Sequence, residues 1–362
     1  MRKSITFGFG IIGCGMISQF HAKAISDLRG GELIGCCALR SESAARFAQS
    51  HGCEPFPTIE AMLADKRVDI VTIATPSGMH MAPAIAAARA GKHVVVEKPL
   101  EVTLEKCDQI IRECEKSGVQ LATIFPSRFH DSSLRLKRAV DRGRFGQLTV
   151  GDAYVKWYRT QAYYDSGTWR GTWTLDGGGA LMNQAIHSVD LLIWMMGPVR
   201  ELTAYTALLA HNRIEVEDVA VATLRFVNGA LGVIEATTAA YPGYLKRIEI
   251  HGTRGSAVLE EEDIKVWDFA KPAKEDRAIA AEMQVSKSEG GGAGNPAAIE
   301  HHGHAKQFAD FLRAIRNRRA PKVDGYEGRR SVEVVQAIYK SAESGGKVIK
   351  LPLDGEPVHR SI

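Results

Sequence analysis

Short apolar runs alternate with helical patterns through the first third of the chain. The apolar runs are ITFGFGII, LIGCCA, VDIVTIA, HVVVE and VQLATI, and the helical segments between them include Met16–Leu28, Met79–Ala90 and Leu104–Lys116. This alternation is typical of a parallel sheet with helices on both faces. It predicts an α/β domain over residues 1–125.

The pattern changes near Pro126, where longer strand-like runs begin to follow one another directly. Those runs are QLTVGDAYVKWYR, RELTAYTALLA, DVAVATLRFV, ALGVIEATTAA and LKRIEIHG. Asn228-Gly229 joins two of them, which is a strong hairpin signal. A long helix over Ala180–Met196 interrupts the series, and two helices are expected near the end of the chain. We predict a second α/β domain over residues 126–362 with a mainly antiparallel sheet.

Charge and composition exclude several classes of partner. The 362 residues carry a formal net charge of only +4 and no basic block, which argues against nucleic acid and anionic membrane surfaces. No run of apolar residues is long enough for a transmembrane helix. The six cysteines lack CxxC spacing, which favours reduced thiols and a cytoplasmic protein.

A glycine turn follows the first predicted strand and precedes a helix. Gly13 permits the tight turn, and Gly15 lets the backbone approach a pyrophosphate at the helix N-terminus. Ser18 takes the third small position, and Met16 and Ile17 lie between. In this context the motif predicts dinucleotide binding, although the same turn alone is compatible with a purely structural role.

The end of the second predicted strand bears on the choice of cofactor. An acidic residue usually stands there to bond the ribose 2′-hydroxyl of NAD, whereas this chain has Ala38, followed by Arg40 and Ser41. A guanidinium can bind a 2′-phosphate through two hydrogen bonds. We therefore expect NADP(H) in preference to NAD(H), the alternative being that Arg40 is only a solvated residue at a helix start.

Two further elements carry candidate chemistry. Lys98 follows the fifth apolar run, at the strand end where open α/β sheets bind ligands. On the predicted helix after three glycines, Asn183, His187 and Asp190 share one face. Histidine is the natural proton acceptor near neutral pH, although a histidine in such a helix is often only a packed core residue.

These elements together resemble the Gfo/Idh/MocA oxidoreductases, named for glucose–fructose oxidoreductase and inositol dehydrogenase. The resemblance rests on GIIGCGMIS with the following histidine, on ATPSGMH, on EKP, on the GGG…H..D helix and on GRRSVEVVQAIYKSAESGGKVIKLP near the end. It implies an N-terminal Rossmann dinucleotide-binding domain and a C-terminal α/β domain with a large open sheet. It also implies a homodimer or homotetramer formed through that sheet.

The resemblance also implies roles for particular residues. Lys98 and His187 match the family's catalytic lysine and histidine. The expected cofactor-binding residues are Gly13, Gly15, Met16, Ile17, Ala38, Arg40, Ser41, Ala74, Thr75, Pro76, His80, Glu97 and Lys98. The expected substrate-binding residues are Asn183, Arg128, Tyr158, Trp169, Arg170 and His304. Asn183 stands where many members have aspartate, so an Asp–His pair is not expected at that position.

Within the family, the stretch around His187 is most similar to the UDP-N-acetylglucosaminuronate 3-dehydrogenases, which are NAD enzymes. The resemblance implies hydride transfer between NAD(P) and a hydroxyl-bearing carbon of a sugar derivative, such as C3 of a nucleotide sugar. The alternatives are a ketose or dehydro-sugar reductase, an NAD-dependent glycosidase and a catalytically silent dinucleotide-binding regulator. The sequence leaves open the identity of the sugar, the oxidised carbon and the physiological direction.

A histidine cluster at His301, His302 and His304 raises the question of a metal site. A metal would need further ligands at a suitable spacing, and no second cluster of cysteine or histidine accompanies these residues. The sequence therefore predicts no bound metal, and His304 is expected to serve the substrate instead.

Overall fold

The computed structural model describes residues 6–285 and 301–353. Within these, residues 6–126 and 301–332 form one compact unit, and residues 127–285 and 333–353 form a second. The first unit thus takes in a C-terminal segment that the sequence analysis placed in the second domain.

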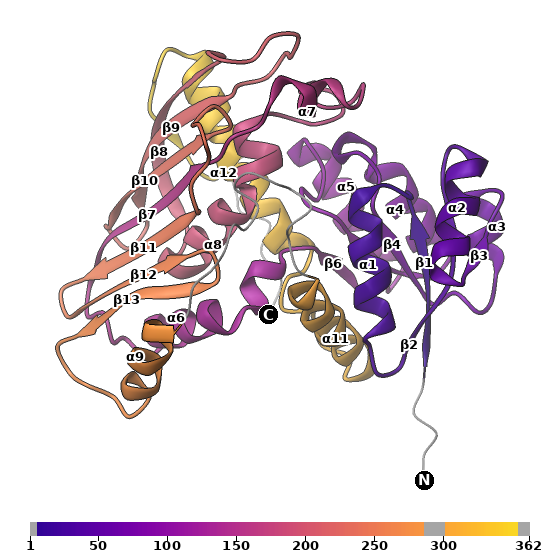
Figure 1. Cartoon of the computed structure of the whole chain (residues 1–362), viewed down its shortest axis with the longest axis horizontal. Helices are drawn as coiled ribbons and strands as arrows, with labels where there is room; N and C mark the ends of the chain where they lie inside the picture. Colours follow the sequence, from indigo (N-terminus) through magenta and orange to yellow (C-terminus); the bar gives the residue numbers. More distant parts are fainter. Residues whose placement is uncertain (1–5, 286–300, 354–362) are drawn as a thin grey trace. The chain divides into compact units, whose positions relative to one another are not determined.

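A six-stranded parallel sheet forms the centre of the first unit (Figure 1). Its order is β3-β2-β1-β4-β5-β6, and every neighbouring pair in this sheet is parallel. The strands are β1 (Phe7–Ile12), β2 (Gly31–Cys37), β3 (Glu54–Pro55), β4 (Ile70–Ile73), β5 (His93–Val96) and β6 (Leu121–Thr123). Five of these were predicted, while the two-residue edge strand β3 was too short to leave a pattern. The Rossmann prediction is confirmed.

Helices surround this sheet, and the α-helices among them bury apolar side chains. They are α1 (Met16–Ser26), α2 (Ser41–His51), α3 (Ile59–Ala64), η1 (Ser77–Met79), α4 (Met81–Arg89), α5 (Leu104–Lys116) and α11 (His302–Arg316). Thr58 and Thr103 cap α3 and α5 by accepting hydrogen bonds from backbone N–H groups of the first turn. α4 is rich in alanine, and its buried alanines allow close approach to the sheet.

Helix α11 explains why the domain prediction differs from the structure. Phe308, Phe311 and Leu312 of α11 are buried in one cluster with Phe9 and Ile11 of β1. The rings of Phe308 and Phe9 meet edge to face at 5.7 Å. The amphipathic pattern of α11 predicted a helix, but it could not show which sheet the apolar stripe would cover.

An eight-stranded sheet dominates the second unit, in the order β13-β12-β11-β7-β10-β9-β8-β14. The strands are β7 (Leu148–Lys156), β8 (Val199–Ala207), β9 (Val219–Phe226), β10 (Leu231–Thr237), β11 (Arg247–Gly252), β12 (Gly255–Glu260), β13 (Asp263–Phe269) and β14 (Ile349–Lys350). β7 and β10 pair in parallel, and the other neighbours in this sheet are antiparallel. The predicted mainly antiparallel sheet is confirmed.

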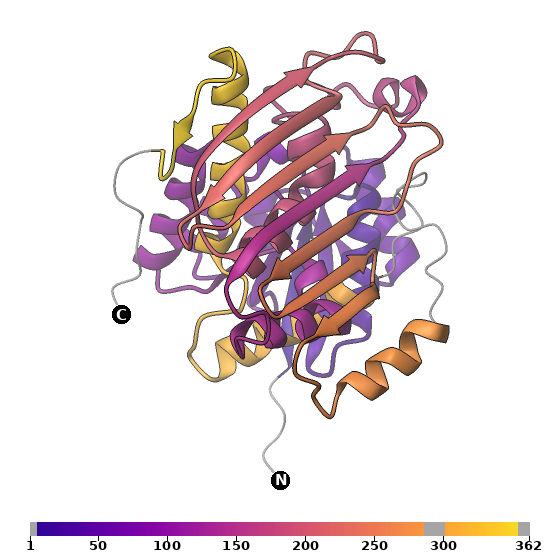
Figure 2. The same cartoon turned by 90° about the vertical axis from the view of Figure 1, so that its left-hand side faces the viewer.

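Figure 2 views this sheet from a face that no helix of the second unit covers. The turn at Asn228-Gly229 joins β9 to β10 as predicted, with Gly229 at a φ of +90°. The remaining helices are η2 (Pro126–Phe129), α6 (Asp131–Asp141), α7 (Gln161–Asp165), η3 (Ala180–Ala185), α8 (Ile186–Met196), α9 (Asp276–Val285) and α12 (Gly325–Glu343). The first residues of α12 belong to the first unit and its remainder to the second.

The predicted helix over Ala180–Met196 is present but has two parts. Ala180–Ala185 forms a π-helical turn, and Ile186–Met196 continues as the α-helix α8. π-helical turns are rare in proteins, and those that occur are often found at functional sites. Gly197, at a φ of +88°, ends α8 where the sequence predicted it. Among the described helices, none combines the length and the apolar character needed to cross a bilayer.

Candidate functional site

The glycine turn after β1 has the geometry that a dinucleotide requires. The N–H of Gly13 donates to the carbonyl of Cys37 at 2.8 Å, and its φ is +97°. A Cβ at Gly13 would lie 2.6 Å from the carbonyl oxygen of Ala74, so no other residue fits there. The turn therefore draws the ends of β1, β2 and β4 together.

Gly15 is the N-cap of α1 and leaves open space in front of the helix N-terminus. A Cβ at Gly15 would meet no heavy atom within 4 Å. The first turn of α1 has no side-chain cap and no acidic residue, so its N–H groups and positive dipole end remain available for an anion. Buried Ser18 donates to the carbonyl of Gly15 at 2.6 Å, which holds the turn. These residues fit the pyrophosphate of a dinucleotide.

The other predicted cofactor residues follow the carboxyl ends of neighbouring strands. Ala38, Arg40 and Ser41 follow β2, Ala74–Pro76 follows β4, and Glu97-Lys98 follows β5. In parallel sheets these ends share one edge, and ligands bind there where the strand order reverses, here between β1 and β4. We refer to the residues after β1, β2, β4 and β5 as the cofactor edge.

His80 has a supporting place at the cofactor edge. It is fully buried, and its two ring nitrogens lie 2.9 Å from the carbonyl of Pro99 and 3.0 Å from that of Thr75. The imidazole thus joins the segments after β4 and β5. This geometry favours a role in shaping the cofactor edge over direct contact with a ligand.

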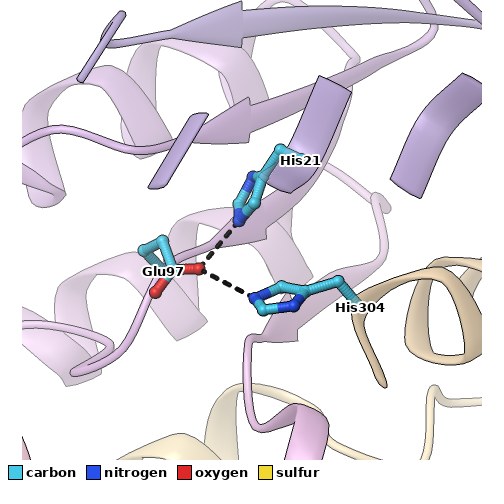
Figure 3. A group of neighbouring side chains, drawn as sticks. All are labelled: His21, Glu97 and His304. Carbon is cyan, nitrogen blue, oxygen red and sulfur yellow. Dashed lines mark hydrogen bonds and ion pairs between the residues drawn. The ribbon is translucent and has the colours of Figure 1, made fainter. Parts of the chain in front are cut away.

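Glu97 lies at the centre of a buried polar group of three side chains (Figure 3). His21 Nε2 lies 2.7 Å from Glu97 Oε1, and His304 Nε2 lies 3.8 Å from the same oxygen. His21 Nδ1 lies 2.8 Å from Thr72 Oγ1, and the backbone N–H of Lys98 donates to Glu97 Oε2 at 3.0 Å. Glu97 therefore fixes the backbone that carries Lys98.

The charges in this group follow from burial and contact. Burial by itself would raise the pKa of Glu97, but the hydrogen bond from His21 and the attraction of the nearby His304 outweigh it and hold this pKa well below its usual range. Burial lowers the pKa of His304 despite its carboxylate neighbour. His304 Nδ1 is buried and has no hydrogen-bond partner among the described residues.

These three side chains also bear on the prediction that no metal is bound. The candidate ligand atoms of His21, Glu97 and His304 lie within 4.8 Å of one another, which no other group of described histidine, cysteine or acidic residues achieves. The 2.7 Å separation between His21 and Glu97 is that of a hydrogen bond. We interpret the group as a hydrogen-bonded network, and the absence of a metal stays a prediction.

In the second unit, His187 lies in the first turn of α8 and is partly exposed. Asp190, one turn later, is fully buried and receives two hydrogen bonds from Arg128, at 2.7 and 2.6 Å. The guanidinium of Arg128 also lies over the ring of Trp194 at 5.2 Å. Arg128 is only 4% exposed. Its buried ion pair favours a role in bracing α8 over the predicted contact with substrate.

The turn that begins η3 is held by a carboxylate that the sequence analysis did not single out. Glu217 accepts hydrogen bonds from the N–H groups of Gly179 at 2.9 Å and Leu181 at 2.8 Å, and from the hydroxyl of Tyr339 at 3.0 Å. A Cβ at Gly179 would lie 1.9 Å from the carbonyl oxygen of Glu217, which explains the glycine. Burial raises the pKa of Glu217 to about 7.

Asn183 is held in a network of polar side chains. Its amide donates to Asp176, and its carbonyl accepts from Gln184 at 2.8 Å. Gln184 in turn donates to the hydroxyl of Tyr163 at 2.9 Å and accepts from Arg159 at 2.9 Å. The orientation of Asn183 is therefore fixed before any ligand binds, which suits a residue that positions substrate.

The loop residues Trp169 and Arg170 join the same network. Arg170 donates to the hydroxyl of Tyr163 at 3.0 Å, and its guanidinium stacks over the rings of Tyr163 at 4.4 Å and Trp169 at 4.7 Å. Tyr158 is partly exposed and packs edge to face on Tyr241 at 5.3 Å. Trp169, Arg170 and Asn183 are thus brought into one network, whereas Tyr158 is not linked to it by these contacts.

Comparison with known proteins identifies the family. Residues 7–125 match an oxidoreductase family with an NAD-binding Rossmann fold, and residues 133–258 match the GFO/IDH/MocA C-terminal domain. The chain therefore belongs to the Gfo/Idh/MocA family of NAD-dependent dehydrogenases that act on sugar hydroxyl groups. The resemblance seen in the sequence is confirmed.

Similar proteins include two with solved structures. The WlbA dehydrogenase from Bordetella pertussis, in complex with NADH and UDP-GlcNAcA, is 38% identical with a TM-score of 0.87 and covers 97% of this chain and 99% of its own. The WlbA dehydrogenase from Chromobacterium violaceum, with the same ligands, is 34% identical with a TM-score of 0.86 and covers 98% of each chain. Myo-inositol 2-dehydrogenase from Thermotoga maritima is 28% identical over 92% of this chain and 96% of its own.

Proposed function

We propose that this protein oxidises a hydroxyl group of a nucleotide-linked sugar acid, at C3 of the sugar. The observation that carries this proposal is the similarity along nearly the whole chain to two WlbA dehydrogenases held with UDP-GlcNAcA. The pre-oriented Asn183 and the stacked Arg170 supply the amide and the cation that such a polar, anionic substrate needs.

The cofactor edge would hold the dinucleotide. Gly13 and Gly15 would admit the pyrophosphate to the N-terminus of α1, and the segments at Ala38 and Arg40 would meet the adenosine ribose. When bound, the dinucleotide would supply the hydride-transfer chemistry for the substrate carbon. The other steps fall to side chains of this chain.

We assign proton transfer to His187 and oxygen stabilisation to Lys98. Partly exposed His187 would take the proton of the substrate hydroxyl as hydride leaves the same carbon. The ammonium of Lys98 would hydrogen-bond that oxygen and stabilise the charge that develops on it. Glu97 positions the Lys98 backbone, and the Arg128–Asp190 pair braces the helix of His187.

For the cofactor, two observations point in different directions. The absence of a carboxylate at Ala38 and the presence of Arg40 favour NADP(H), whereas both WlbA structures hold NADH. Arg40 is exposed, so solvent weakens its attraction for a 2′-phosphate. We therefore propose that NAD(H) is used and that NADP(H) is tolerated, in contrast to the expectation from the sequence.

The test is absorbance near 340 nm after the full-length protein is mixed with NAD or NADP and a panel of sugars. The panel contains UDP-GlcNAcA, UDP-GlcNAc, myo-inositol and a free uronic acid. Steady reduction with the nucleotide-linked acid, and little with its neutral counterpart, supports the proposal. Turnover of myo-inositol alone contradicts the substrate class, and release of an aglycone without net reduction indicates a glycosidase.

We also propose that subunits associate through the uncovered face of the eight-stranded sheet (Figure 2). This face carries exposed apolar side chains on neighbouring strands, namely Val150, Tyr205, Val221 and Leu231. Apolar groups at one face favour burial against a second copy. Val221→Asp should reduce the molar mass measured by light scattering, and an unchanged mass contradicts this interface.

The six free thiols support a cytoplasmic location.

A further inference from the structure

Two arginine side chains converge on one aromatic ring in the second unit. The guanidinium of Arg170 lies 4.4 Å from the centre of the Tyr163 ring, and that of Arg159 lies 5.6 Å from it. Tyr163 belongs to α7, Arg159 follows β7, and Arg170 lies in the loop before η3. Because like charges repel, this arrangement favours the binding of an anion close to the ring.

Hydrogen bonds fix the direction of the Tyr163 hydroxyl. Arg159 Nη2 donates to Gln184 Oε1 at 2.9 Å, so the amide nitrogen of Gln184 faces Tyr163 and donates to its hydroxyl oxygen at 2.9 Å. Arg170 Nη1 donates to the same oxygen at 3.0 Å. Both lone pairs of this oxygen are therefore occupied, and its proton has no acceptor among the described residues.

The same group of side chains offers more donors than acceptors. Arg170 Nε donates to Ser166 Oγ at 3.2 Å, and none of the described carboxylates forms an ion pair with its guanidinium. The ring of Trp157 lies 4.9 Å from the guanidinium of Arg159, and its buried Nε1 has no hydrogen-bond partner in the described part of the chain. Surplus donors together with positive charge suit an anionic oxygen ligand.

The two arginines differ in their access to such a ligand. Arg159 is 3% exposed, and its terminal nitrogens donate to the carbonyl of Tyr158 at 3.0 Å and to Gln184. Arg170 and Tyr163 are partly exposed. Arg159 therefore positions Gln184, whereas Arg170 and Tyr163 can contact the ligand.

This group is tied to the helix that carries His187. Gln184 lies in η3, three residues before His187, and donates to the side-chain carbonyl of Asn183 at 2.8 Å. The acidic side chain in the network, Asp176, already accepts from Asn183 and from the N–H of Gly171 at 2.8 Å. An anion held by Arg170 would therefore belong to the sugar that His187 acts on.

We propose that Arg170 and Tyr163 bind the carboxylate of the sugar acid and that this contact determines the preference for the acid over a neutral sugar. The inference rests on the proposed function, which places a nucleotide-linked sugar acid beside His187. A carboxylate is planar and singly charged, and it can accept from a guanidinium edge and from the Tyr163 hydroxyl. The diphosphate of the same ligand carries two charges, for which this group supplies one partly exposed guanidinium.

The experiment compares kcat/KM for UDP-GlcNAcA with kcat/KM or the inhibition constant for UDP-GlcNAc, in the full-length wild type and in variants. We expect Arg170→Gln to lower kcat/KM for the acid roughly 10- to 100-fold and to leave the neutral sugar nearly unaffected. Tyr163→Phe, which keeps the guanidinium, should lower the preference less. NADH binding, measured by fluorescence, should stay unchanged in both variants.

Arg213→Gln is the matched control, because Arg213 belongs to the same unit and pairs with exposed Asp165 at 2.8 Å. It should keep the wild-type preference. Equal losses for both sugars in Arg170→Gln overturn the inference. An equally weakened inhibition by UDP alone also overturns it, because the diphosphate would then occupy the site.

If the wild type turns over neither nucleotide sugar, the proposed function fails instead. Calorimetric titration with glucuronate then tests the carboxylate site by itself. An affinity that falls in Arg170→Gln and is retained in Arg213→Gln supports the site. An affinity that Arg170→Gln leaves unchanged, or no binding to the wild type, overturns it.

Discussion

The hydroxyl of Tyr339 donates a 3.0 Å hydrogen bond to Glu217, which also accepts the N–H groups that open the π-helical turn before His187. Tyr339 lies in α12 and Glu217 lies just before β9, so two distant segments hold one turn. Both side chains are buried. The relationship identifies Glu217 as a positioning residue for Asn183 and His187.

We expect Glu217→Gln to lower kcat by roughly tenfold to a hundredfold while the KM for the dinucleotide stays unchanged. In the variant, one carboxylate oxygen is replaced by an NH₂ group, which cannot accept a hydrogen bond. A backbone N–H that meets an oxygen in the wild type would then face another donor, and the turn would be displaced. Tyr339→Phe, which keeps the carboxylate, should have a smaller effect. An equal loss of kcat and of dinucleotide affinity would indicate general misfolding instead.

Glu217 should also make the free energy of unfolding depend on pH. Burial raises its pKa from 4.5 to about 7 in the folded state. The native state therefore binds more protons between these values, so the unfolding free energy from this group falls as pH rises through about 7. Urea unfolding of the wild type and of Glu217→Gln at several pH values between 5 and 8 measures the difference. Parallel curves would contradict the assignment.

The polar group around Glu97 predicts the opposite pH dependence. The pKa of Glu97 lies well below 4.5 and that of His304 below 6.5. The unfolded state binds more protons here, so stability falls as pH falls below about 6.5. His304→Gln should flatten this decline in thermal unfolding. His301→Gln is the control, because His301 is partly exposed and pairs with Asp27 at 2.8 Å; an equal change in both variants would argue against the buried network.

We expect His187→Ala to reduce kcat by roughly 10²–10⁴-fold, the range for losing a general base, while dinucleotide binding survives. Binding should survive because the cofactor edge lies on other elements, namely β1, β2, β4 and β5. The measurement is steady-state turnover together with NADH fluorescence titration. Near-normal turnover would remove His187 from the mechanism.

Lys98→Ala should impair turnover and also weaken binding of the dinucleotide, because Lys98 follows β5 at the cofactor edge. Lys92→Ala is the matched control. Lys92 comes just before the amino end of β5, whereas Lys98 follows its carboxyl end. The ammonium of Lys92 donates to the carbonyls of Asp65 at 3.0 Å and Val68 at 2.7 Å. If titration and kcat of Lys98→Ala both match the wild type, the strand-end lysine is structural.

Cofactor choice provides the last test. Ala38→Asp combined with Arg40→Ala should shift the kcat/KM ratio toward NAD(H), because a carboxylate bonds the ribose diol and repels a 2′-phosphate. Loss of a charge-assisted hydrogen bond that is shielded from solvent costs about 1.5–3 kcal/mol of binding free energy. The cost is smaller at Arg40, because this side chain is exposed. We expect roughly a tenfold change or less. An unchanged ratio would show that these residues do not contact the ribose.

Local patterns in the sequence determined much of this protein. The apolar runs placed β1, β2, β4, β5 and β6, because a buried parallel strand needs a continuous apolar stretch. The glycine turn, the Asn228-Gly229 hairpin and the end of α8 at Gly197 were predicted because they depend on backbone conformations that glycine favours. Motif order was specific enough to indicate the family.

The tertiary structure alone decided which distant side chains meet. It placed α11 on the parallel sheet, and it brought His304 to Glu97 and Tyr339 to Glu217. Hydrophobic periodicity specifies which face of an element is buried but not its partner, because burial is non-directional. Partners, and with them the shifted pKa values, arise only when the elements pack.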